Sequence, residues 1–163
     1  MKIVSDTGPL IGLAKIDCLS ILKNIATEVL IPPMVHRELL GKVGIESAKI
    51  DNALNDFIHI TDLKPLDLTT KEALADLDEG EGQAIGLAFT FSEDVLLLID
   101  DHVGREVAEK LNIPTTGLLG ILLLAKEKGI LKKIGFLIDA LREQRYWISD
   151  EIADIAKHLA GEI

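Results

Sequence analysis

Carboxylate side chains that follow two apolar runs are the residues of this sequence best placed to act together. Asp6 follows Lys2–Ser5, and Asp100 and Asp101 follow Val95–Ile99. If both runs are strands of one parallel sheet, their carboxyl ends meet at the edge where open α/β sheets bind ligands. The alternative is that each aspartate only caps the helix that follows it, the commoner role for a single aspartate. Finding acids after both strands favours a site.

A further carboxylate, Glu81, lies on the apolar face of a predicted helix. Ala84, Ile85 and Ala88 follow it at three, four and seven residues, which places them on the same face. A carboxylate on a buried face is costly unless a cation or hydrogen-bond donors meet it. Its distance from Asp78 also fits a capping box, in which Glu81 folds back onto the Asp78 backbone. The spacing alone does not choose between these roles.

Glu38 shows the same pattern more weakly, four residues after Met34 and three after Val35. The adjacent His36 and Arg37 could pair with a phosphate or simply be solvated. A lone glutamate at a helix edge is usually exposed. Glu38 is therefore a candidate that needs support from elsewhere.

Together these carboxylates form an all-oxygen set without histidine or cysteine, which suits Mg²⁺ or Mn²⁺ better than zinc. Like charges held close together repel unless cations are present, so without metal the site should be partly protonated or poorly stable. The matching chemistry is two-metal phosphodiester hydrolysis, in which one ion lowers the pKa of an attacking water and the second stabilises the leaving oxygen. The sequence has no Gly-rich phosphate loop, nucleophile elbow or zinc motif.

The elements that must position these residues alternate between strands and helices, which indicates a parallel sheet in an α/β sandwich. Strands are predicted at 2–5, 28–31, 57–60, 95–99 and 113–115. Asp17 is predicted to cap a turn that runs through Leu22, and Thr69 with Glu72 to begin a short helix. Longer helices are predicted at 45–56, 78–91, 103–111, 118–128, 131–144 and 149–160, besides those that hold Leu13 and Glu38. The chain should form one domain, 1–163, with the helical tail from about residue 131 packed on it.

Composition narrows the class of protein further. The 163 residues are 48% hydrophobic, with a mean hydropathy of +0.29, which argues against disorder. The net charge of −10 argues against a broad basic surface for nucleic acid, although a carboxylate cluster filled with cations is locally less negative. The lone cysteine, Cys18, predicts a reducing, cytoplasmic setting. No apolar run is long enough to span a membrane.

At these residues the sequence resembles the PIN-domain family, and above all its short prokaryotic PIN-like proteins, which are often described as uncharacterised or predicted nucleic-acid-binding. The likeness covers nearly the whole chain, and its blocks occur in the expected order. They are Ser5–Ile11, Val35–Leu39, Leu77–Ile85, Leu98–Ala108 and Gly117–Leu122.

The resemblance implies a three-layer α/β/α sandwich with a five-stranded parallel sheet of order 3-2-1-4-5, in which the first and fourth strands are neighbours. It also implies a ribonuclease that uses Mg²⁺ or Mn²⁺ to cut RNA, often the toxin of a toxin–antitoxin pair, with an antitoxin as partner, and often a homodimer. Carried over, the catalytic residues are Asp6, Glu38, Glu81 and Asp101. The metal ligands are Asp6, Glu81, Asp100 and Asp101, and Asp101 fits slightly better than Asp100 because Ala108 follows it at the family's usual interval.

Three further residues are candidates for contact with substrate: Thr7, Arg105 and Thr116. Arg105 could instead form a salt bridge on its own helix. The sequence departs from the family at Leu118, where relatives often place a hydroxyl residue; Thr115 or Thr116 could take its place.

Two other functions compete with the nuclease. One is a weakly active or inactive PIN-like module that binds nucleic acid or protein, which the negative charge and Leu118 favour. The other is a metal-dependent phosphoryl-transfer enzyme such as a phosphatase, against which the missing nucleophile motif counts.

Overall fold

The computed structural model describes residues 1–42, 44–91 and 93–162, so the predicted domain end at residue 163 lies outside it. Within these residues, five parallel strands form one sheet, and its order β3-β2-β1-β4-β5 confirms the prediction. Ser5, at the end of β1, stands opposite Leu98, at the end of β4. The strands are β1 (Lys2–Ser5), β2 (Glu28–Ile31), β3 (Ile58–Ile60), β4 (Val95–Leu98) and β5 (Thr115–Thr116).

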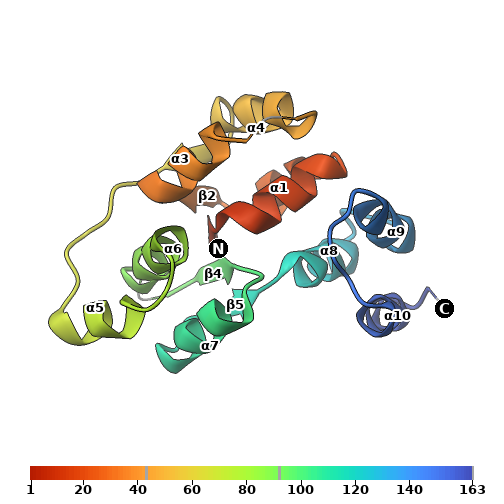
Figure 1. Cartoon of the computed structure of the whole chain (residues 1–163). Coiled ribbons are helices and arrows are strands. Elements are labelled where there is room, and N and C mark those ends of the chain that lie inside the picture. The colour runs from red at the N-terminus through yellow and green to blue at the C-terminus, as the bar shows by residue number, and fades with distance from the viewer. Residues whose placement is uncertain (43, 92, 163) are drawn as a thin grey trace.

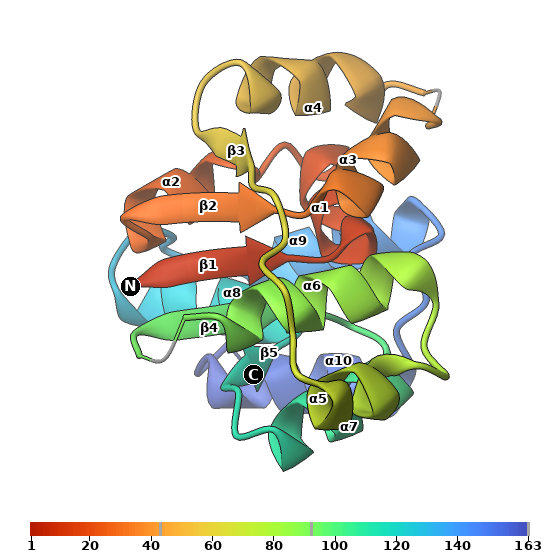
Figure 2. The ribbon, with the colours of Figure 1, turned by 90° about the vertical axis from the view of Figure 1, so that its left-hand side faces the viewer.

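Helices cover both faces of the sheet and complete the three layers (Figures 1 and 2). In Figure 2, α6 lies in front of the strands, and α8 and α9 lie behind them. The first face carries α1 (Thr7–Lys15), α2 (Ser20–Ile25), α3 (Pro33–Leu40), α4 (Glu46–Leu54), α8 (Leu118–Glu127), α9 (Gly135–Glu143) and α10 (Asp150–Leu159). The second carries α5 (Leu68–Leu74), α6 (Glu79–Phe89) and α7 (His102–Lys110).

The alternation of side chains along each strand divides the interior into two cores. Ile3 and Leu98 point into the core under α1 and α8, whereas Val4 and Leu97 point into the core under α6. All four are fully buried. A strand buried on both faces must be apolar at every position, which explains the uninterrupted Val95–Ile99 run.

Two predicted helix caps are wrong. Asp17 does not cap α2, whose N-cap is Leu19; it adopts a left-handed conformation (φ 57°), which a short polar side chain tolerates, and closes the turn after α1. Thr69 and Glu72 do not begin α5. Asp67 does so instead, because its carboxylate accepts a hydrogen bond from Thr70 N at 2.7 Å.

The last strand and the C-terminal helices also differ in their bounds. β5 begins at Thr115, after Pro114, which has no N–H to donate to the sheet. α9 begins at Gly135 rather than 131, because the Glu162 carboxylate accepts hydrogen bonds from the N–H groups of Ile134 and Gly135. The expected Ser149 cap of α10 is present, with Ile152 N donating to Ser149 Oγ at 3.1 Å.

No described helix is long and apolar enough to cross a membrane.

Candidate active site

The carboxyl ends of β1 and β4 bring the predicted acids to one edge of the sheet. Asp6 N donates to Leu98 O at 2.9 Å, so the two chains remain paired up to the first aspartate. α6 begins at the same edge and packs against α3, which carries Glu38 (Figure 2). Seven carboxylates lie close enough for the charge of one to raise the pKa of another: Asp6, Glu38, Asp78, Glu79, Glu81, Asp100 and Asp101.

Asp6 is the most central member of this cluster. Burial and, to a smaller degree, the charges of Asp78, Glu38 and Asp100 raise its pKa from 3.8 to about 6, against the lowering effect of the Thr7 amide. Although Asp6 is the N-cap residue of α1, its side chain makes no capping hydrogen bond. The alternative role as a simple cap therefore does not account for Asp6.

Glu81 is held among negative charges at the first turn of α6. Burial raises its pKa from 4.5 to about 8, and the charges of Asp78, Asp101 and Asp6 contribute. Only half of the predicted capping box is present among the described hydrogen bonds: Glu81 N donates to Asp78 Oδ1 at 2.8 Å, without a return bond from the Glu81 side chain to Asp78 N. Glu81 is thus oriented into the cluster.

Glu38 meets the cluster through a close approach of α3 and α6. A Cβ added to Gly80 would lie 1.9 Å from Glu38 Oε1, so only glycine leaves room for this carboxylate. Burial, with the charge of Asp78, raises the Glu38 pKa, and the nearby Thr7 hydroxyl partly offsets the rise. The Thr7 hydroxyl is near Glu38 but not in hydrogen-bonding geometry with it, so within the described residues Glu38 Oε1 and Thr7 Oγ1 are both buried without a hydrogen-bond partner. Such orphaned oxygens are costly and point to a missing donor or cation.

The two consecutive aspartates after β4 have different surroundings. Asp100 is half-buried and accepts hydrogen bonds from Leu118 N at 2.8 Å and from the Tyr146 hydroxyl. Asp101 is exposed and caps α7, accepting from Gly104 N at 2.8 Å. Asp100 raises the pKa of Asp6, and Asp101 raises that of Glu81, so each borders the cluster on its own side. The preference for Asp101 as the ligand stays a prediction.

Sequence reasoning missed two residues of this site. Asp78 was interpreted only as a helix cap, yet its charge raises the pKa of Asp6, Glu38 and Glu81. Its place in the same turn as Glu81 was the signal. Tyr146 carried no comparable signal, because it reaches Asp100 across 46 residues of sequence.

Two of the candidates for contact with substrate, Arg105 and Thr116, differ in how close they lie to the carboxylates. The guanidinium of Arg105 reaches towards Gly117 and lowers the pKa of Asp100, whose burial otherwise raises it. In the described part of the chain Arg105 makes no ion pair within 4 Å, so the salt bridge considered as its alternative role is not formed there. The Thr116 hydroxyl is 3.5 Å from Gly117 O and packs over Gly120, with no contact to the carboxylates among the hydrogen bonds.

Leu118 has a structural role at the position where relatives often carry a hydroxyl. Its side chain is 1% exposed and lies against Gly12, where a Cβ would come within 2.6 Å of it. Its backbone N–H holds Asp100. The backbone thus supplies a donor to the site, and the side chain belongs to the core.

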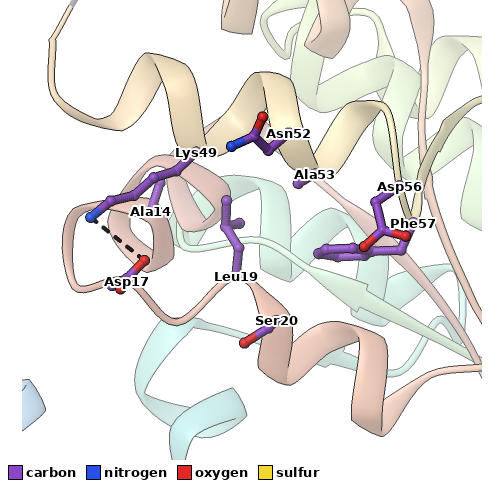
Figure 3. A pocket seen from close by; sticks show the side chains of 9 residues that line it. All are labelled: Ala14, Asp17, Leu19, Ser20, Lys49, Asn52, Ala53, Asp56 and Phe57. Atoms are coloured by element: carbon purple, nitrogen blue, oxygen red, sulfur yellow. Dashed lines mark ion pairs between the residues drawn. The ribbon is translucent and has the colours of Figure 1, made fainter.

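A pocket between α1, α2 and α4 lies at the far end of α1 from Asp6 (Figure 3). It includes the Lys49–Asp17 ion pair, at 3.6 Å, with Phe57 among its walls. It shares no residue with the carboxylate cluster. We assign no catalytic role to it.

Comparison with known proteins agrees with the geometry. A family model described as PIN domain matches residues 2–162. The chain belongs to the PIN-domain family. No curated protein and no solved structure matches it. PIN domains are generally nucleases, which supports a nuclease-like hydrolase as the broad class of this PIN-domain protein.

PIN nucleases typically use divalent metal ions, and the donor chemistry of this PIN domain fits such ions. The cluster consists of carboxylates, the ligands that Mg²⁺ and Mn²⁺ prefer. Glu38 Oε1, for which the described residues provide no hydrogen-bond partner, can accept a further contact. In the described residues no three acidic, histidine or cysteine side chains converge closely enough to hold an ion as they stand. A bound ion would therefore require these side chains to move closer together.

Proposed function

We propose that this PIN-domain protein is an Mg²⁺- or Mn²⁺-dependent endoribonuclease that hydrolyses RNA phosphodiester bonds at the carboxylate cluster. The observation that carries the proposal is the elevated pKa of Asp6 and Glu81, to about 6 and about 8, among carboxylates that lack a cationic partner within 4 Å in the described structure. Such a cluster is unfavourable by itself and becomes favourable with divalent cations. Strongly perturbed acids in one place are typical of catalytic sites.

Within the proposal, Asp6, Glu81, Asp100 and Asp101 would hold the metal ions, and Glu38 would support them with an oxygen that has no hydrogen-bond partner among the described residues. When bound, two divalent ions supply an activated water and neutralise the charge on the leaving oxygen. The chain's own residues do the positioning. Tyr146 and Leu118 N fix the Asp100 carboxylate. Glu81, whose pKa is raised to about 8, would have to lose its proton to hold a cation, whereas Asp6, with a pKa of about 6, is mostly ionised at neutral pH.

The overall charge of −10 is compatible with RNA as substrate only if contact is local. Arg105, which lies beside Asp100 and makes no ion pair within 4 Å in the described residues, offers one phosphate contact next to the acids. The same charge favours the second candidate function, a PIN-like module that binds nucleic acid or protein without cutting. Cleavage distinguishes the two directly.

The biological setting is a further part of the proposal. The family resemblance supports a cytoplasmic toxin with an antitoxin partner, and a homodimer. Exposed apolar side chains on α9 and α10, Phe136, Ile155 and Leu159, provide a surface for such contacts. Light scattering on the purified chain would measure its assembly.

The test is cleavage of an end-labelled single-stranded RNA by the purified chain with Mn²⁺ or Mg²⁺. Asp6→Asn and Glu81→Gln should lower the rate at least about 100-fold, since each removes a carboxylate that acts through the metal. Asp154→Asn, an exposed acid on α10, is the matched control and should cut normally. Cleavage that persists in Asp6→Asn, or in excess chelator, would show that the mechanism is wrong. RNA binding without cleavage would favour the non-catalytic module.

A further inference from the structure

A cavity of about 620 Å³ adjoins the carboxylate cluster on the side of Asp100. Its walls come from Arg105 of α7, from the first turn of α8, and from the segment 146–152 that leads into α10. Asp100 belongs both to this cavity and to the cluster, so the two are continuous. Its volume is in the range typical of small-ligand sites.

Trp147 is the most unusual residue of this cavity. It is the only tryptophan of the sequence, and it is 85% exposed to solvent. An indole left in water forgoes a large hydrophobic gain, and Ile152, 47% exposed and part of the same cavity wall, adds to the exposed apolar surface. Leu119 and Ile152 also line the cavity and add apolar surface to it.

The cavity wall also contains charged residues, Arg105 and Asp100. The Arg105 guanidinium lies beside Gly117 and Asp100 and makes no ion pair within 4 Å in the described structure. A guanidinium without a carboxylate partner is well suited to a phosphate, which it can bind through two donors. The cavity thus combines a flat aromatic surface with a guanidinium that has no ion pair within 4 Å in the described residues, next to acids proposed to cut a phosphodiester.

We infer that this cavity binds one nucleotide of single-stranded RNA, with its base stacked on Trp147 and its phosphate at Arg105. The inference rests on the proposed function, because it places this nucleotide beside the bond that is cut at Asp100. Every base has a π face, so stacking on an exposed indole suits single strands of any sequence. Local stacking with one phosphate contact also explains how a chain of charge −10 can hold RNA.

A protein surface is the main rival occupant, since exposed tryptophans are frequent at the centres of interfaces. The charged residues of the cavity disfavour it. Interface cores are depleted of charged residues, whereas Asp100 and Arg105 form part of this wall. The polar groups would lose water without partners from an apolar protein surface.

Because Trp147 is the only tryptophan, its fluorescence reports on this cavity alone. The probe is a single-stranded oligoribonucleotide of about ten nucleotides, added to the Asp6→Asn chain with Mg²⁺ so that RNA is not consumed. We expect saturable quenching by this RNA and none by a sugar–phosphate oligomer of the same length that lacks bases. Anisotropy of labelled RNA measures binding in the variants. Trp147→Ala should weaken binding roughly 5- to 150-fold, and Trp147→Phe less.

The matched control is Phe136→Ala, which removes another exposed aromatic, on α9 and outside the cavity, and should bind RNA normally. Circular dichroism checks that each variant is folded. RNA that binds without quenching, and equally well to Trp147→Ala and Trp147→Phe, would overturn the inference. So would a change from dimer to monomer in Trp147→Ala with RNA binding intact, which would assign the surface to a second copy of the chain.

The two proposals fail in different ways. If the unmutated chain cuts RNA and Trp147 has no effect on binding, the nucleotide site is wrong and the nuclease stands. If RNA quenches Trp147 but is never cut with Mn²⁺ or Mg²⁺, the nuclease is wrong and the nucleotide site stands.

Discussion

Replacing Asp6 by asparagine should stabilise the metal-free protein at about pH 8 and leave it nearly unchanged at about pH 4. Burial and neighbouring carboxylates raise the pKa of Asp6 from 3.8 to about 6 in the folded chain. The folded state therefore holds this proton more tightly than the unfolded state. The resulting penalty is absent below about pH 4 and complete above about pH 6, so stability is lost as pH rises through that window. Asparagine has the same shape and no charge, so it removes the penalty.

The magnitude follows from the size of the pKa rise. One pKa unit is worth about 1.36 kcal/mol, so a rise from 3.8 to about 6 corresponds to about 3 kcal/mol. Asp6 is half-buried, and water screens part of this energy, so we expect a gain of about 1–3 kcal/mol at pH 8. Glu81, whose pKa rises from 4.5 to about 8, gives both proteins a further loss of stability between those pH values.

The assay is urea unfolding of both proteins in chelator at the two pH values, repeated with Mn²⁺. Metal that binds only the folded chain stabilises it by about 2.7 kcal/mol at 100 times its dissociation constant. We expect this gain in the unmutated protein and a much smaller one in Asp6→Asn. Asp154→Asn should follow the unmutated protein throughout. The reasoning is refuted if Asp6→Asn destabilises the chain equally at both pH values, or if Mn²⁺ stabilises both proteins equally.

Two further substitutions test how the carboxylates are positioned. Gly80→Ala would place a Cβ 1.9 Å from Glu38 Oε1 and displace this flexible side chain. RNA cleavage should therefore fall about tenfold or more, while the free energy of urea unfolding changes by less than about 1 kcal/mol. The control is Gly8→Ala, whose Cβ meets open space and should leave RNA cleavage unchanged. Tyr146→Phe keeps the ring but removes the hydrogen bond to Asp100, so titration calorimetry should show Mn²⁺ binding weakened roughly 10-fold or more; unchanged affinity would mean that the bond has no role in the site.

Local pattern determined much of this fold, because side-chain alternation and apolar runs are properties of neighbouring residues. The Val95–Ile99 run predicted a strand buried on both faces, and Asp6 and Asp100 were expected at one sheet edge because parallel strands end together. The position of Glu81 on the apolar face of its helix could also be predicted from the sequence. The order 3-2-1-4-5 came from family resemblance, and the sheet confirms it.

Tertiary structure decided which of several suitable side chains fills each position. Asp67 rather than Thr69 begins α5, since both types can cap and only the path of the chain selects one. α9 begins where Glu162, distant in sequence, supplies its cap.

Some site residues are positioned by their own strand, and others by contacts with segments that are distant in sequence. Asp6 could be found from the sequence because its strand places it. Glu38 gains its position from the close approach of α3 and α6 at Gly80, and Tyr146 from the packing of the C-terminal segment across the sheet edge. Contacts between segments distant in sequence depend on packing of the whole chain, which no local pattern of residues encodes.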